Sequence, residues 1–196
     1  EVYSIDESFF RLPPRRQGQG DVEAARKIIA AVAREVGLPI RIGLGPTRTL
    51  SKVANALAKA SEAIWGGVID LHDEELRARL FREWPVQEVW GIGPARAAKL
   101  TQMGIRTAGD LAQMDPELAR RVGTVVLERL VRELGGISCT ELAVEEQPLK
   151  ATAVTRAFGA PVETCHELRE AMCRRAQRAA EKIRAQGLEA SRLIAF

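Results

Sequence analysis

Two adjacent acids, Asp6 and Glu7, stand in an apolar stretch near the start of the chain, Tyr3-Ser4-Ile5-Asp6-Glu7-Ser8-Phe9-Phe10. Carboxylates are hard oxygen ligands, suited to Mg²⁺ that bridges substrate phosphates. Two ions held by acids stabilise both the attacking and the leaving oxygens of an in-line phosphoryl displacement. Taken alone, the pair fits an exposed turn with two solvated acids better than it fits a metal site. Its apolar flanks argue against such a turn and favour a metal site.

A glycine-rich segment, Gly43-Leu44-Gly45-Pro46-Thr47, leads into a predicted helix, and its spacing is not that of a Walker A loop. Four polar residues recur at helical spacing on one face of this helix: Arg48, Lys52, Asn55 and Lys59. A cationic face that begins one turn into a helix suits a triphosphate, helped by the helix N-terminus. An ordinary solvated face accounts for the same spacing, which by itself favours that alternative.

The turn Gly91-Ile92-Gly93, followed by a predicted helix from Pro94, matches the helix-hairpin-helix pattern. In that pattern glycines let backbone N–H groups approach a DNA phosphate, and Arg96 and Lys99 lie close enough to add positive charge. Such contacts position DNA without reading its sequence. A hairpin used only for packing is the alternative.

Near the end of the chain, Lys150, Thr152 and Arg156 alternate along a predicted strand and suit contacts to a nucleic-acid backbone on an open sheet. His72 and His166 are lone histidines without a metal-ligand pattern, and neither is assigned a role.

The predicted elements form two patterns, an alternating one and a helical one. Residues 1–71 alternate as β-α-β-α-β, with strands at 2–12, 39–44 and 68–71 and helices at 22–35 and 47–60. From residue 72, short helices are predicted at 73–82, 94–103, 107–113, 116–121 and 125–134. A polar linker then leads to a strand at 149–158, a helix at 164–184 and a strand from 191. This order indicates an α+β protein.

Composition narrows the class of protein. The 196 residues carry a net charge of +3, which permits a nucleic-acid partner without proving one. No apolar run approaches the ~20 residues of a membrane span, and the N-terminus lacks a signal-peptide pattern. The three cysteines are odd in number and lack Cys-x-x-Cys spacing, which predicts reduced, buried thiols in a cytosolic protein.

In this order, the motifs resemble those of the Y-family (translesion) DNA polymerases, and most of all the UmuC type, the catalytic subunits of DNA polymerase V. Residues 3–12 look like the family's Ser-Ile-Asp-Glu palm motif, residues 43–59 like its Gly-x-Gly-Pro-Thr-x-Thr-Leu-x-Lys segment, and residues 89–111 like its thumb hairpin. Further similar segments lie at 126–134, 155–159 and 179–184. The likeness covers essentially the whole chain.

The resemblance implies part of a polymerase palm over residues 1–71, an all-helical thumb with the helix-hairpin-helix over 72–140, a linker over 141–148 and part of an α/β little finger over 149–196. It implies that Asp6 and Glu7 bind catalytic Mg²⁺ in a two-metal site and that Lys52 contacts the triphosphate of the incoming dNTP. The residues that would contact DNA are Gly91, Gly93 and Arg96 in the thumb and Lys150 and Arg156 in the little finger.

The implied reaction is template-directed nucleotidyl transfer past damaged bases, as in SOS-type DNA repair. A primer 3′-hydroxyl attacks the α-phosphate of a dNTP on primer-template DNA, and pyrophosphate leaves. The implied partners of the intact protein are a UmuD′ dimer, RecA and the sliding clamp, in the bacterial cytoplasm and without a membrane. A stand-alone, sequence-independent DNA-binding module built on the helix-hairpin-helix, without catalysis, is the alternative.

Both ends of the chain lie in β-like apolar runs, which favours an internal piece of a larger protein. The family's first palm strand, with a third metal-binding carboxylate, and its fingers are expected before residue 1. The rest of the little finger, and any clamp-binding peptide, are expected after residue 196.

We therefore expect residues 1–196 alone to be inactive as a polymerase, because the sequence supplies only two of three metal-binding carboxylates. Extension of a labelled primer with Mg²⁺ and dNTPs measures this, and no product above the enzyme-free background is the expected result. Incorporation by the isolated chain that depends on both Mg²⁺ and Asp6 would contradict it.

Overall fold

The computed structural model describes residues 1–13, 20–142 and 151–195. The chain divides into two units, Glu1–Val144 and Glu145–Phe196. The subdomain limits inferred at 71/72 and 140/141 stay predictions, and Lys150 lies outside the described residues with most of the proposed linker. In the described part of the chain, every helix is too short or too polar to cross a bilayer.

The first half of unit one is a small parallel sheet with helices packed against it. Its elements are α1 (Asp21–Val36), β1 (Ile42–Leu44), α2 (Arg48–Ala60), α3 (Glu62–Trp65) and β2 (Val68–Asp70). Strands β1 and β2 pair in parallel, with Ile42 opposite Val68 and Leu44 opposite Asp70, and both α1 and α2 contact them. The predicted helices are confirmed, and two of the predicted strands are present in shortened form.

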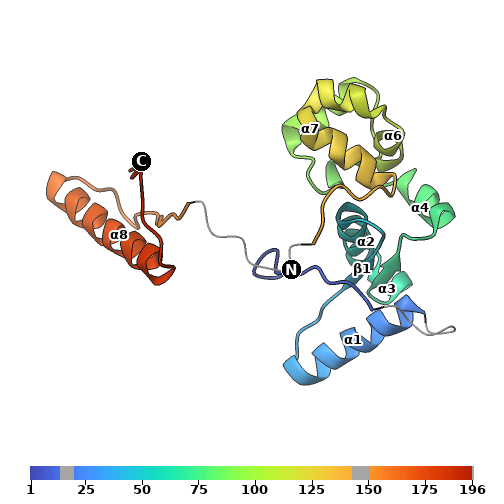
Figure 1. Cartoon of the computed structure of the whole chain (residues 1–196), viewed down its shortest axis with the longest axis horizontal. Coiled ribbons are helices and arrows are strands. Elements are labelled where there is room, and N and C mark those ends of the chain that lie inside the picture. Colours follow the sequence, from blue (N-terminus) through green and yellow to red (C-terminus); the bar gives the residue numbers. More distant parts are fainter. Residues whose placement is uncertain (14–19, 143–150, 196) are drawn as a thin grey trace. The chain divides into compact units, whose positions relative to one another are not determined.

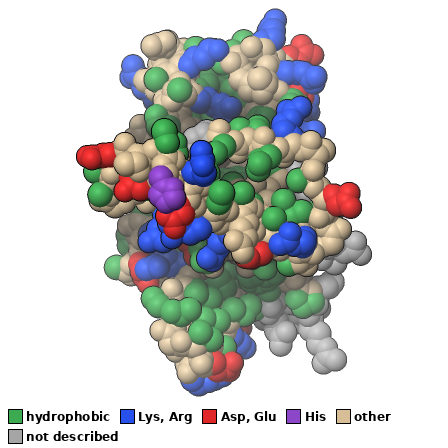
Figure 2. All heavy atoms as spheres, turned by 90° about the vertical axis from the view of Figure 1, so that its left-hand side faces the viewer, with side chains coloured by type: hydrophobic (Ala, Val, Ile, Leu, Met, Phe, Trp, Pro, Cys, Tyr) green, Lys and Arg blue, Asp and Glu red, His purple; other side chains and the backbone are tan. Residues whose placement is uncertain are grey.

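Helix α1 ends where the sequence predicts, because Gly37 adopts φ 73° and its N–H donates to Ala33. It packs on the sheet through Ala25, which is fully buried. At its end, Val36 and Leu38 are exposed, and Figure 2 shows hydrophobic side chains in the lower part of the view, at the height of α1 in Figure 1.

The second half of unit one is helical, as predicted. It contains α4 (Glu74–Phe81), the 3₁₀ helix η1 (Val86–Glu88), α5 (Pro94–Gln102), α6 (Ala108–Ala112) and α7 (Pro116–Leu134). Asp73 and Asp115 cap their helices, and Thr107 forms a capping box with Asp110. Helix α7 is broken at Gly123 and Thr124, which confirms the two separate helices predicted over this stretch.

The predicted first strand, residues 2–12, is wrong. Residues 1–9 form a tight loop, here called the acid loop, closed by one isolated bridge between Val2 and Ser8. The N–H groups of Tyr3 and Ser4 both donate to the carbonyl of Glu7, at 2.9 and 3.1 Å. Because these donors are satisfied within the loop, they are not available to a neighbouring strand.

In unit two, the predicted helix is confirmed as α8 (Cys165–Ala185), which begins with a capping box between Thr164 and Glu167. The α/β prediction for this unit is wrong for the described residues, since 151–158 and 191–195 contain no strand. A strand needs a hydrogen-bonded neighbour, and no such pairing forms among residues 151–195. The three cysteines are free thiols, but Cys165 and Cys173 are exposed and Cys139 is only partly buried, so the prediction of buried thiols is wrong.

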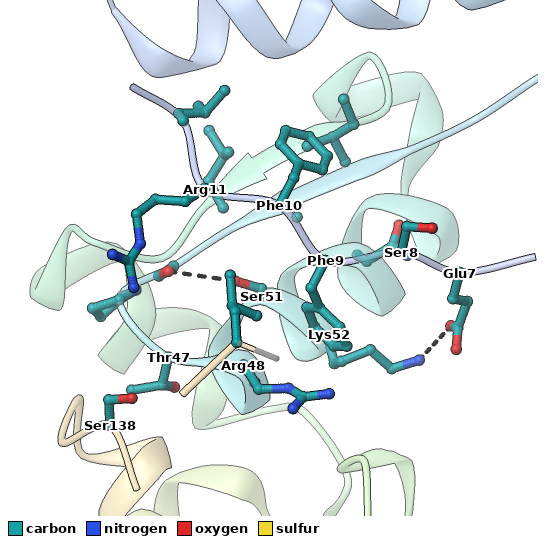
Figure 3. Close-up of a pocket in the computed structure, with 18 of the residues that line it drawn as sticks. Glu7, Ser8, Phe9, Phe10, Arg11, Thr47, Arg48, Ser51, Lys52 and Ser138 are labelled. Atoms are coloured by element: carbon teal, nitrogen blue, oxygen red, sulfur yellow. Dashed lines mark hydrogen bonds and ion pairs between the residues drawn. The ribbon is translucent and has the colours of Figure 1, made fainter. Parts of the chain in front are cut away.

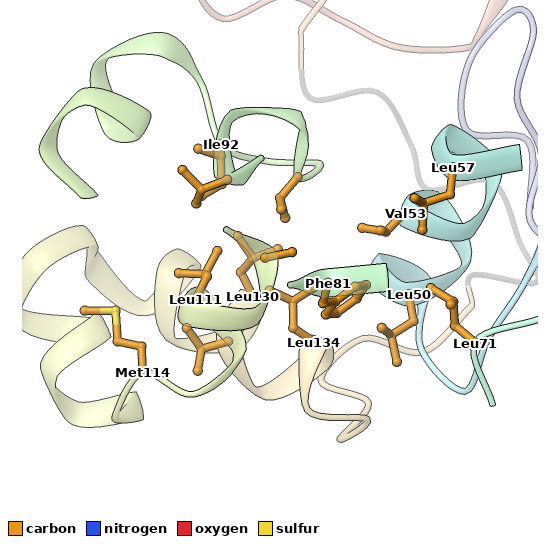
Figure 4. Packing of buried hydrophobic residues seen from close by; sticks show 14 of the residues in the cluster. Leu50, Val53, Leu57, Leu71, Phe81, Ile92, Leu111, Met114, Leu130 and Leu134 are labelled. Atoms are coloured by element: carbon orange, nitrogen blue, oxygen red, sulfur yellow. The ribbon is translucent and has the colours of Figure 1, made fainter. Parts of the chain in front are cut away.

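One hydrophobic core joins the two halves of unit one (Figure 4). Leu50 and Val53 from α2 are fully buried in the same cluster as Phe81 from α4 and Leu134 from α7. The core therefore fixes α2, which lies on the sheet, against the helical half.

Buried hydrogen bonds between α2 and α7 accompany this apolar packing. Glu133 of α7 is only 4% exposed, and its carboxylate accepts hydrogen bonds from the N–H of Thr49, at 3.1 Å, and from the Thr49 hydroxyl. The Thr47 hydroxyl donates to the backbone carbonyl of Glu133 at 3.0 Å. The start of α2 is thus hydrogen-bonded to Glu133 at the end of α7.

We expect Glu133→Ala to lower the free energy of unfolding by about 2–4 kcal/mol, because it leaves buried donors of Thr49 unsatisfied. Denaturant unfolding followed by circular dichroism measures the change. The matched control is Glu35→Ala, at an exposed position on α1, with an expected change below ~0.5 kcal/mol. Equal losses in the two variants would show that Glu133 does not hold the two halves together.

Candidate functional site

The glycine-rich segment brings α2 tightly against β1. A Cβ atom at Gly43 would lie 2.1 Å from the carbonyl oxygen of Ser51, and one at Gly45 would lie 2.9 Å from the Cβ of Leu50. No larger residue fits at Gly43 without moving the α2 backbone. These glycines therefore serve helix–strand packing, and the groups beyond them on α2 are left to face a ligand.

A cavity of about 720 Å³ opens where the acid loop, the start of α2 and the segment after α7 meet. Asp6 and Glu7 line it from the acid loop, Arg48 and Lys52 from α2, and Cys139 from the segment after α7. The structure thus brings together the predicted acid pair and the predicted cationic face, which are more than forty residues apart in sequence.

The cationic face is already bound to carboxylates of the acid loop. The ammonium group of Lys52 forms an ion pair with Glu7, as Figure 3 shows, and Arg48 pairs with Glu1 at 2.7 Å. The Lys52 and Arg48 side chains are only 14% and 13% exposed, which strengthens these pairs relative to surface ones. Sequence spacing predicted the face but not its partners.

The N-terminus of α2 does not present the N–H groups that the sequence suggested for a phosphate. The N–H of Thr49 donates to Glu133, and the N–H of Leu50 donates to the Thr47 hydroxyl at 3.1 Å. Since both are satisfied inside the protein, an anion in the cavity is left to the side chains of Arg48 and Lys52. The prediction that the N-terminus of α2 helps to bind a phosphate is therefore wrong for these two amides.

Asp6 lies exposed beside this ion-paired face. The Ser4 hydroxyl donates to its carboxylate at 2.7 Å and, together with the backbone N–H of Asp6 and the charge of Lys52, lowers the pKa of Asp6 below its ordinary value. Asp6 is therefore a carboxylate at neutral pH, in the form that a cation binds.

The two acids have the donor type that Mg²⁺ takes, but they do not complete a metal site. Among residues 1–13, 20–142 and 151–195, no group of three or more Asp, Glu, His or Cys side chains is placed to hold a metal ion. Glu7 is also bound to Lys52. No catalytic step through a metal follows from these residues alone.

Three aromatic rings surround the ion pairs, and sequence reasoning missed their role. Tyr3 packs edge-on against Phe9 and against Trp90, with 5.6 Å between ring centroids in both pairs. The guanidinium of Arg48 lies 4.6 Å from the Phe9 ring centroid. The only sequence signal was the aromatic flank of the acid pair, because Trp90 is distant in the chain.

The turn predicted to belong to a helix-hairpin-helix lies beside this cluster, since Trp90 directly precedes Gly91. Gly91 adopts φ 89°, a conformation that favours glycine, and its carbonyl accepts a hydrogen bond from the Arg96 guanidinium at 2.6 Å. A Cβ atom at Gly93 would meet no described atom within 4 Å, so the approach to this turn is open. Lys99 donates to the carbonyl of Val122 at 2.8 Å and is drawn toward the break in α7.

The remaining predicted DNA contacts, Lys150 and Arg156, belong to unit two. Arg156 lies exposed in unit two, outside any helix or strand, and Lys150 is outside the described residues. Their role as DNA contacts stays a prediction.

Known proteins are similar to this chain over the segments that carry the acid pair and the cationic face of α2. Residues 1–56 match the impB/mucB/samB family. Protein UmuC of Salmonella typhimurium is 40% identical over 185 residues, which cover 94% of this chain and 44% of that protein. Protein MucB of Escherichia coli is 39% identical over 184 residues, with the same two coverages.

More distant similarities include proteins named as DNA polymerases. DNA polymerase IV of Corynebacterium diphtheriae is 34% identical over 147 residues, which cover 73% of this chain and 31% of that protein. A solved insertion ternary complex of Dbh DNA polymerase is 21% identical, with a TM-score of 0.45, over 58% of this chain and 32% of that one. The chain thus spans less than half the length of each of these proteins.

The ion pair between Lys52 and Glu7 predicts that Glu7→Gln binds inorganic triphosphate about three to ten times more tightly than the unaltered chain in the presence of EDTA. The physical reason is that Lys52 loses its carboxylate partner and is left to the anion. Isothermal titration calorimetry measures both affinities.

The matched control removes an equal charge away from the cavity. Glu35→Gln changes an exposed acid at the end of α1, and its effect on triphosphate affinity is expected to stay within about twofold. Lys52→Met is expected to weaken binding. Equal affinities of Glu7→Gln and Glu35→Gln would show that Glu7 and triphosphate do not compete for Lys52.

Proposed function

Because this chain is related in sequence to the UmuC type of the Y-family DNA polymerases over 94% of its length, we propose that it is part of an error-prone translesion DNA polymerase. The observation that carries the proposal is the joint cavity of the acid pair and the cationic face of α2. The reaction is proposed for a protein of the relatives' length: template-directed transfer of a nucleotide from a dNTP to a primer past damaged bases.

In this proposal the cationic face holds the triphosphate of the incoming nucleotide. Lys52 and Arg48 stand on one face of α2, line the cavity and are paired with carboxylates that a triphosphate replaces by exchange. An exchange of one anion for another costs less than desolvating an unpaired cation, because the side chains leave one partner only as they gain the next. Lys52 is the residue proposed to orient the phosphates.

Asp6 and Glu7 are proposed as two carboxylates of a Mg²⁺ site that a further carboxylate from outside the described residues completes. Mg²⁺ in such a site neutralises phosphate charge and stabilises the oxygens that attack and leave. Asp6 is kept ionised by its hydrogen bonds, and Glu7 becomes available to a cation when Lys52 turns to the triphosphate.

The helix-hairpin-helix is proposed to hold the DNA backbone. The open turn gives a phosphate access to the N–H groups of Gly91 and Gly93, whereas the N–H of Ile92 donates to Val89, and Arg96 is hydrogen-bonded to the Gly91 carbonyl. Arg156 and Lys150 are proposed as further backbone contacts. A UmuD′ dimer, RecA and the sliding clamp are proposed as partners of the full-length protein.

Substitution of the acids tests this function in the full-length polypeptide. Asp6→Asn and Glu7→Gln are each expected to lower primer extension on the order of a hundredfold or more, because each removes a carboxylate from the proposed metal site. Gel-based extension of a labelled primer with Mg²⁺ measures the rate, and fluorescence anisotropy measures DNA affinity, which is expected to stay within about twofold.

The same pair of measurements separates a polymerase from a DNA-binding module. A full-length protein that binds duplex DNA but extends no primer, with or without the two acids, would refute the polymerase. Glu35→Gln serves as the control, with unchanged extension, since this residue lies outside the cavity lining.

A further inference from the structure

Trp90 stands between the proposed DNA-binding turn and the acid loop. Its neighbour on one side, Val89, is 2% exposed and anchored in the core. Its neighbour on the other side, Gly91, is the first glycine of the hairpin turn and adopts φ 89°. The backbone of Trp90 is thus part of the turn, whereas its ring packs outside the helical half.

The ring of Trp90 contacts the acid loop. Its centroid lies 5.6 Å from that of Tyr3, at an interplanar angle of 77°, and 6.5 Å from that of Phe9. Edge-to-face pairs at such distances stabilise a contact beyond simple burial of area. The chain has one Tyr and three Trp among nine aromatic residues, and its only Tyr makes this contact.

The same ring contacts the cation of the site. The ammonium nitrogen of Lys52 lies 5.7 Å from the Trp90 ring centroid and 5.5 Å from that of Tyr3, within the range of a cation–π interaction. Lys52 is therefore held by Glu7 on one side and by two rings on the other. A shift of Trp90 changes the surroundings of the proposed triphosphate contact directly.

We propose that Trp90 is a positioning residue that couples DNA binding at the hairpin turn to triphosphate binding at Lys52. This inference rests on the proposed function. A DNA phosphate bound by the N–H groups of Gly91 and Gly93 restrains the backbone that carries Trp90. The restrained ring then orders Tyr3 and holds the Lys52 side chain in place. By reciprocity, a bound triphosphate strengthens DNA binding by the same factor.

The experiment measures this coupling in the chain of 196 residues. Affinity for inorganic triphosphate is determined by calorimetry with and without a saturating short blunt DNA duplex, at constant ionic strength. Inorganic triphosphate is chosen because it cannot pair with a template base, so that coupling through base pairing is absent. The unaltered chain is expected to bind triphosphate about fivefold more tightly when DNA is bound.

Substitutions of Trp90 test whether its ring carries the coupling. Trp90→Ala is expected to reduce the coupling factor below about twofold, and Trp90→Phe, which keeps a ring, to restore a larger part of it. Trp65→Ala is the matched control, since Trp65 lies in α3 and packs on the core, and its coupling factor is expected to equal that of the unaltered chain.

A second variant keeps the inference testable if Trp90→Ala disturbs folding, which near-ultraviolet circular dichroism reports. Tyr3→Ala removes the other partner of the contact from the acid loop, where Tyr3 is 44% exposed and outside the core. It is expected to lose the same coupling, and the double variant is expected to lose no more than either single one.

The outcomes separate this inference from the proposed function. Coupling that persists in both Trp90→Ala and Tyr3→Ala overturns the role of Trp90. An unaltered chain that binds DNA and triphosphate independently of each other also overturns it, while the proposed function stands. A chain that binds neither ligand overturns the inference together with the proposed binding roles of Lys52 and of the Gly91–Gly93 turn.

Discussion

The carboxylate of Glu133, buried at the end of α7, is the contact on which the geometry of the first unit depends. It accepts the N–H and the hydroxyl of Thr49, while Thr47 donates to the backbone carbonyl of the same residue. Apolar packing between α2 and α7 is compatible with small sliding motions, whereas these hydrogen bonds are directional and lie where water does not replace them. The start of α2, and with it the cationic face, therefore has one position relative to the helical half.

That position has a consequence for anion binding. Because Glu133 and Thr47 satisfy two N–H groups at the start of α2, the side chains of Arg48 and Lys52 carry the positive potential of the cavity. These side chains are in turn balanced by Glu7 and Glu1 of the acid loop and by the aromatic rings around them. The buried charges are thus compensated before any ligand arrives, as a stable fold requires. The same carboxylates are the ones with the chemistry to bind a cation, so anion and cation binding at this cavity are physically linked.

Much of the helical architecture was predictable because its signals are local. Thr47, Asp73, Thr107, Asp115 and Thr164 each cap a helix through bonds to N–H groups two or three residues away, and Gly37 ends α1 in a left-handed conformation. Strands were predicted less well, since pairing depends on a distant neighbour. The acid loop is an example, because its apolar and aromatic residues predicted a strand. Its backbone N–H groups at Tyr3 and Ser4 instead donate to the carbonyl of Glu7. Its aromatic side chains pack on Trp90 and Arg48 and not on the face of a sheet.

The sequence by itself determined the residue types of the site: an acid pair in an aromatic setting, cations at helical spacing and glycines in a hairpin turn. These follow from the order of residues, because spacing of three or four along a helix places side chains on one face in any protein. Only the tertiary structure decided their partners. The pairing of Lys52 with Glu7, the capping of α2 by Glu133 and the contact of Trp90 with Tyr3 join residues between 45 and 87 positions apart in the chain. Such contacts depend on how the core joins α2 to the helical half, which no local pattern encodes.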